Sequence, residues 1–192
     1  MSEPVSYTNR KGKTYYLHAA TTKTGKTRYV MTKTAEDALT KLPIGYIIAE
    51  SVNGQVSAGR IQPKLITDSE QAMVKSELER LGLNRYCCDV KGPYITVYEP
   101  LHRESDFLPI LKSMGALASM IEEYLSERID KGPFEPVMRF RVFDSEKRIF
   151  EVERMTYRGR GGWMSLHEYS ALKKLIRKYL KHLGKDSFYE LM

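Results

Sequence analysis

The segment VMRFRVFDSEKRIFEVERMTY, residues 137–157, contains two apolar-rich runs on either side of a polar turn. The runs are residues 137–143 and 148–157, and the turn is DSEK at residues 144–147. Two strand-like runs joined by so short a turn predict a β-hairpin. Because the strands of a hairpin are antiparallel, this segment favours an antiparallel sheet.

Three more hairpins are predicted, and each has a glycine in its turn: residues 15–31, 46–61 and 86–98. The second turn contains Asn53-Gly54, and Asn-Gly is the strongest short signal for a hairpin. The third turn is Gly92-Pro93.

Helices are expected between the hairpins, because apolar residues there recur at three-and-four spacing or follow capping signals. Thr67 with Glu70 and Ser165 with Glu168 have the spacing of capping boxes, which begin helices. The predicted helices are residues 35–41, 68–81, 107–125 and 165–183. The chain is therefore expected to be an α+β protein in which antiparallel β-hairpins alternate with helices.

Positive charge is concentrated at the two ends of the 192-residue chain, whose net charge is +7. Residues 1–33 carry seven Lys or Arg against one Glu, and residues 137–192 carry thirteen against seven Asp or Glu. The composition changes near Gln62-Pro63. We predict a basic, hairpin-rich N-terminal module over residues 1–62 and an α+β domain with a basic C-terminal helix over residues 63–192.

The cellular context is expected to be the cytoplasm. The first residues contain no apolar run typical of a signal peptide, and no stretch is long and apolar enough to span a membrane. Cys87 and Cys88 are adjacent, a spacing that disfavours a disulfide between them and supplies too few ligands for a zinc site. No metal or other cofactor is expected.

Four short segments lie near the ends of the chain: TNRKG at 8–12, TYYLH at 14–18, TKTGK at 22–26 and HLGKDSFYELM at 182–192. In these segments the chain resembles a set of uncharacterised bacterial proteins. No activity is assigned to that set, so the resemblance implies no function.

The predicted C-terminal helix separates charge from apolar surface. At 100° per residue its cations gather on one side, namely Lys173, Lys174, Arg177, Lys178 and Lys181, followed by Lys185. The apolar residues gather on the other side. With no acid among them, the cations repel one another unless an anion meets them, so both a polyanionic ligand and a plain solvated face remain open. Membrane binding is disfavoured because the apolar side is needed for a core.

The segment RGRGGW, residues 158–163, precedes this predicted helix. Arg158 and Arg160 could contact phosphates and Trp163 could stack on a base, in one surface continuous with the helix. The alternative is a glycine-rich connector in which Trp163 packs against the core.

Lys23, Lys26 and Arg28 lie in and after the turn of the first hairpin. Residues 20–27 loosely match a phosphate-binding loop, but the first glycine is missing and a strand is predicted where a helix is needed. We therefore interpret these cations as a second phosphate-contacting group rather than as a nucleotide site.

Asp89-Val90-Lys91 resembles the acid-x-lysine element of metal-dependent nucleases, with Glu77 or Glu79 as a further carboxylate. The second metal-binding aspartate expected one strand earlier is absent. The four histidines do not form a convincing ligand pair and are expected at surface or boundary positions.

The function predicted from the sequence is binding of DNA or RNA through backbone phosphates, by the N-terminal hairpin and the C-terminal helix. Two alternatives remain: a metal-dependent nuclease using Asp89 and Lys91, and an adaptor whose basic ends bind an acidic protein.

Overall fold

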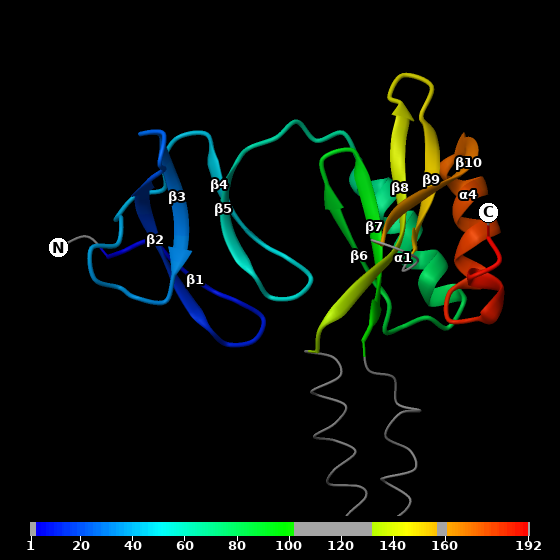
Figure 1. Ribbon diagram of the computed structural model, residues 1–192, viewed down its shortest axis with the longest axis horizontal. Coiled ribbons are helices and arrows are strands. Elements are labelled where there is room, and N and C mark those ends of the chain that lie inside the picture. Colours follow the sequence, from blue (N-terminus) through cyan, green and yellow to red (C-terminus); the bar gives the residue numbers. More distant parts are fainter. Residues whose placement is uncertain (1–2, 102–131, 157–160, 192) are drawn as a thin grey trace, which may run out of the picture. The chain divides into compact units, whose positions relative to one another are not determined.

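The computed structural model describes residues 3–101, 132–156 and 161–191 (Figure 1). The chain divides into two compact units, Met1–Gln62 and Pro63–Met192. In these ranges all strand pairs are antiparallel and two α-helices are present, so the predicted α+β class is confirmed. The predicted helix at 107–125 lies outside the described residues.

The N-terminal unit consists of a three-stranded sheet and a separate hairpin. The sheet strands are β1 (Ser6–Thr8), β2 (Thr14–Thr21) and β3 (Thr27–Thr32), in that order. The hairpin strands are β4 (Tyr46–Glu50) and β5 (Val56–Arg60). Both hairpins predicted in this part of the chain are confirmed.

The helix predicted at residues 35–41 is wrong. Leu39 donates its backbone N–H to the carbonyl of Leu17 (2.7 Å) and accepts from the N–H of Val5 (2.8 Å). Asp37 has a φ of +59°, outside the right-handed helical region. Main-chain pairing with distant residues therefore replaces the local helical hydrogen bonds.

The side chain of Asn9 connects two turns of the N-terminal unit by hydrogen bonds. Its buried amide donates to the carbonyl oxygen of Gly54 (2.6 Å), and its Oδ1 accepts from the N–H groups of Lys11 and Lys13 (3.1 and 2.9 Å). Gly54 has a φ of +75°, which glycine adopts without strain. One side chain thus links the β1–β2 turn to the Asn53-Gly54 turn.

The C-terminal unit is built on a five-stranded sheet in the order β10-β9-β8-β7-β6. Its strands are β6 (Cys87–Lys91), β7 (Tyr94–Pro100), β8 (Phe134–Asp144), β9 (Ile149–Thr156) and β10 (Gly162–Ala171). The hairpins predicted around residues 92–93 and 144–147 are confirmed as β6–β7 and β8–β9.

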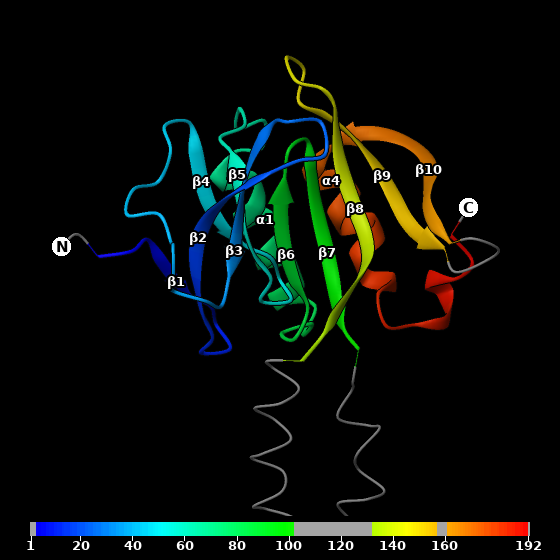
Figure 2. The ribbon, with the colours of Figure 1, turned by 60° about the vertical axis from the view of Figure 1, so that its left-hand side comes forward.

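Two helices, α1 (Asp68–Arg80) and α4 (Leu172–Tyr179), cover one face of this sheet (Figure 2). The strands contribute alternate residues to that face, including Ile95, Phe140 and Val152, which lie side by side in the register and are fully buried. None of the helices in the described ranges is long and apolar enough to cross a membrane.

The capping box at Thr67 is confirmed. The Thr67 hydroxyl accepts from the N–H of Glu70, and the Glu70 carboxylate accepts from the N–H of Thr67. Gly82, with a φ of +72°, follows the helix as expected.

The capping box predicted at Ser165 is wrong, because residues 162–171 form strand β10. Ser165 pairs with Glu153 of β9, and its hydroxyl donates to the carboxylate of Glu151 (2.6 Å). A bulge follows, in which His167 has a φ of +51°. The helix begins only at Leu172 and ends at Tyr179, followed by a 3₁₀ turn η2 (Leu180–His182).

Glu70 also binds the β8–β9 hairpin. Arg148 donates to both carboxylate oxygens of Glu70 and to the carbonyl of Leu65 (3.2 Å). Burial opposes ionisation of Glu70, but the hydrogen bonds from Arg148 and Thr67 outweigh it and lower the pKa of this carboxyl. A charge-assisted contact between residues 78 positions apart therefore links α1 to the sheet.

We predict that Glu70→Gln lowers the free energy of unfolding by about 2 kcal/mol at pH 7, because it removes the charge-assisted bonds to Arg148. The folded-state pKa of Glu70 is depressed, so this contribution is lost as the pH falls through that pKa. Chemical denaturation at pH 7 and pH 3 measures both effects. Asp68→Asn, on the same helical turn but 84% exposed, is the control and should change stability little. Equal losses from both variants would contradict the assignment.

Candidate nucleic-acid interface

The cations of α4 and η2 form an exposed row. Five cations of this segment are exposed: Lys173, Lys174, Arg177, Lys178 and Lys181. The apolar residues between them are buried in the core: Leu172, Leu175, Ile176, Tyr179 and Leu180. The hydrophobic contact with the sheet therefore directs the cationic side of this segment to the surface. We call the five cations the helical cation row.

One member of the helical cation row is neutralised. The Glu168 carboxylate accepts hydrogen bonds from Lys178 and from the hydroxyl of Tyr179 (2.6 Å). These two bonds lower the pKa of Glu168, and Glu168 raises the pKa of Lys178. The sequence interpretation missed this acid, because it placed Glu168 at the start of the helix instead of on β10.

A second carboxylate is held on α1, the helix packed against α4. Glu77 of α1 is buried and accepts hydrogen bonds from Nε and Nη2 of Arg80 (3.0 and 2.7 Å). α1 packs against α4, and the charge of Arg177 contributes to lowering the pKa of Glu77. Arg80 therefore belongs to the same basic surface. Arg80 was not predicted as part of this surface, although its i,i+3 spacing from Glu77 is readable from the sequence.

Trp163 does not belong to this surface. It lies half-buried on β10, and the guanidinium of Arg139 is 4.2 Å from its ring centre and 4.2 Å from that of Tyr94. Arg139 also pairs with Glu153. Because Phe140 points into the core beneath the helices, its neighbour Arg139 and this cluster lie on the opposite face of the sheet.

The surface continuous from the 158–162 loop to the helix was predicted on the premise that the helix begins at Ser165, and that premise is wrong. Strand β10 begins at Gly162, and the helix begins only at Leu172, after the other end of this strand. Arg158 and Arg160 lie outside the described residues, so the continuous surface itself stays a prediction.

The N-terminal cations form a separate group. Lys23 and Lys26 are exposed in the β2–β3 turn, and Arg28 is exposed on β3. The N–H of Lys26 donates to the hydroxyl of Thr22 (3.0 Å), and Thr27 begins a strand. This geometry is that of a hairpin turn, without the helix that a phosphate loop requires.

The proposed nuclease residues do not assemble into a metal site. Asp89 is half-buried on β6, and burial raises its pKa. Glu77 is bound to Arg80. Within residues 3–101, 132–156 and 161–191 no three His, Cys, Asp or Glu side chains gather closely enough to hold a metal ion.

The other polar candidates have ordinary structural contacts. His18 lies 2.9 Å from the carbonyl of Thr34, and His182 lies 2.9 Å from the hydroxyl of Ser187. His167 is exposed, and His102 lies outside the described residues. Neither Cys87 nor Cys88 is in a disulfide, and burial raises the pKa of Cys88 to about 11, so its thiol stays protonated.

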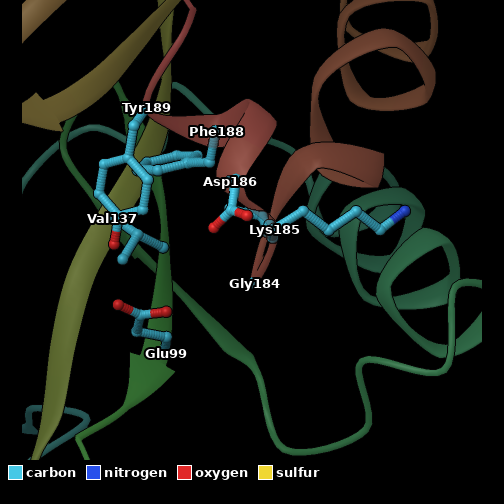
Figure 3. A pocket seen from close by; sticks show the side chains of 8 residues that line it. Glu99, Val137, Gly184, Lys185, Asp186, Phe188 and Tyr189 are labelled. Atoms are coloured by element: carbon cyan, nitrogen blue, oxygen red, sulfur yellow. The ribbon is translucent and has the colours of Figure 1, made fainter.

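A cavity of about 190 Å³ lies beside the C-terminal turns of the second unit. Figure 3 shows the carboxylates of Glu99 and Asp186 on its lining, with the Lys185 side chain extending away from them. Phe188 and Tyr189 supply aromatic walls. Its acidic lining does not suit a phosphate group, so the helical cation row is the stronger candidate for an anion.

In the residues that the structure describes, the second unit is thus an antiparallel sheet with two α-helices on one face and a basic helical surface. Comparison of the chain with protein-family models, curated proteins and solved structures gives no match.

We predict that Trp163→Ala lowers the free energy of unfolding by about 2 kcal/mol, because it removes apolar contact and the stacking on Arg139. Affinity for nucleic acid should not change, since Trp163 and the helical cation row lie on opposite sides of the sheet. Thermal unfolding followed by circular dichroism, together with a binding titration, tests both statements. Lost affinity with unchanged stability would instead identify Trp163 as a base-stacking residue.

Proposed function

We propose that this protein binds nucleic acid by gripping backbone phosphates with the helical cation row. The observation that carries the proposal is that three lysines of this row are exposed and have no carboxylate partner among the described residues. Lys173, Lys174 and Lys181 are exposed, and no carboxylate of the described residues forms an ion pair with them. Unpaired cations held in a row are unfavourable alone and are stabilised by a polyanion.

The spacing of the row suits a chain of phosphates. Lys173, Arg177 and Lys181 follow one another at four-residue intervals, which places successive side chains about 6 Å apart along the axis. Their contact with phosphates releases counterions from the nucleic acid, and this release drives association. Contacts of this kind position a protein on the backbone without reading the base sequence.

Lys23, Lys26 and Arg28 are proposed as a second group of phosphate contacts. They belong to the other compact unit and project from an exposed hairpin. An acidic protein is the alternative ligand for either group, since surface carboxylates also attract exposed cations.

We predict that the triple variant Lys173→Ala, Lys174→Ala, Lys181→Ala weakens binding to duplex DNA or RNA by about tenfold or more. The slope of log affinity against log salt should become shallower by about two to three, one for each lost phosphate contact. Fluorescence anisotropy at several salt concentrations measures both, and the nucleic acid should remain uncut with Mg²⁺ present.

The matched control removes three other exposed lysines of the same unit: Lys64, Lys91 and Lys147. It has the same net charge as the triple variant and keeps the helical cation row. Equal weakening in both variants would show that affinity depends on the net charge of the protein and not on the helical cation row. Absence of binding by the wild-type protein at low salt would refute the proposed function.

A further inference from the structure

Glu77 is a buried acidic residue whose partner, Arg80, is exposed. Its side chain is 9% exposed, although it is charged, and it lies on the buried side of α1 with Val74 and Leu78. Both of its carboxylate oxygens are engaged, one by Nε and one by Nη2 of Arg80. The side chain of Arg80 is 63% exposed, so the cation faces the surface while the anion is held beneath it.

Arg177 belongs to α4, which packs against α1, and its charge acts on the same carboxylate without forming an ion pair with it. The hydrogen bonds from Arg80, with smaller contributions from the charges of Arg80 and Arg177, outweigh burial and lower the pKa of Glu77. Glu77 is therefore an anion at neutral pH. It is bound to Arg80 of its own helix and feels the charge of Arg177 from the helix packed beside it.

The same two arginines are suited to a phosphate. A guanidinium donates two parallel N–H groups to a carboxylate or to a phosphate in the same bidentate manner. While the Glu77 carboxylate accepts Nε and Nη2 of Arg80, those donors are not available to an external anion. The effective positive charge of Arg80 and Arg177 towards solvent is reduced as well.

We infer that Arg80 and Arg177 form a further phosphate-binding position on this surface, and that Glu77 competes with the phosphate for it. One of the protein's own carboxylates therefore lowers its affinity for nucleic acid. The inference rests on the proposed function and adds to it one residue, Arg80, and one internal competitor, Glu77.

The test is a substitution that should strengthen binding. Glu77→Gln keeps the shape of the side chain but removes the charge that neutralises Arg80, and it should tighten binding to duplex DNA by about five- to tenfold. The matched control is Glu79→Gln, two residues away on α1. Glu79 is exposed and forms no ion pair with the described residues, and its substitution changes net charge equally. The control should tighten binding less than about twofold.

Combined variants show whether the arginines carry the gain. Glu77→Gln together with Arg80→Ala, or together with Arg177→Ala, should lose most of the tightening. Circular dichroism verifies that each variant is folded. Arg177→Ala alone gives a reading that does not depend on changing a buried residue: it should weaken binding more than Lys178→Ala, whose cation is already paired with Glu168.

The outcomes separate this inference from the proposed function. Equal effects of Glu77→Gln and Glu79→Gln, or equal effects of Arg177→Ala and Lys178→Ala, would overturn the inference while binding by the wild-type protein persists. No binding by the wild-type protein or by Glu77→Gln would overturn both.

Discussion

Hydrophobic contact between two helices and one face of the five-stranded sheet holds the second unit together. Phe140 and Phe150 of the sheet and Leu175 and Ile176 of α4 are fully buried in one cluster. Burial of these side chains is the main favourable term for folding. It also sets the orientation of α4, because a helix with its apolar side on a sheet must present its other side to solvent. The exposed cations are thus a geometric consequence of the core.

Carboxylates from other elements then modify this basic surface. Glu168 of β10 pairs with Lys178, and Glu77 of α1 pairs with Arg80, while the charge of Arg177 acts on Glu77 from α4. Each acid is largely withdrawn from water, so its effect on the neighbouring cation is screened less than that of an exposed acid. Lys173, Lys174 and Lys181 form no ion pair with a carboxylate of the described residues, whereas Arg80 is paired with Glu77.

The opposite face of the sheet is organised by paired charges instead. Arg141 donates to Glu151, which also accepts from the hydroxyls of Ser165 and Tyr169 (2.6 and 3.2 Å). Arg139 pairs with Glu153 and stacks near Trp163. Cross-strand pairs of opposite charge stabilise a sheet and leave little net charge to attract a polyanion. The two sides of this unit therefore differ in electrostatic character.

Local signals in the sequence were sufficient where the structure uses local interactions. The capping box at Thr67, the Asn53-Gly54 turn and the strands on either side of residues 144–147 all depend on neighbours a few residues apart. The amphipathic character of residues 172–183 was equally readable, because helical spacing alone sorts its apolar and charged side chains.

Tertiary contacts determined the features that the sequence did not predict. Ser165 has the spacing of a helix cap but pairs with β9, and Leu39 sits in a helical pattern but bonds to Leu17. The carboxylates whose charges act on Lys178 and Arg177 lie on another strand and another helix, so these interactions become visible only when the chain is folded. Backbone hydrogen bonds and buried charges must find partners wherever the fold supplies them, so distant contacts override local preference at these positions.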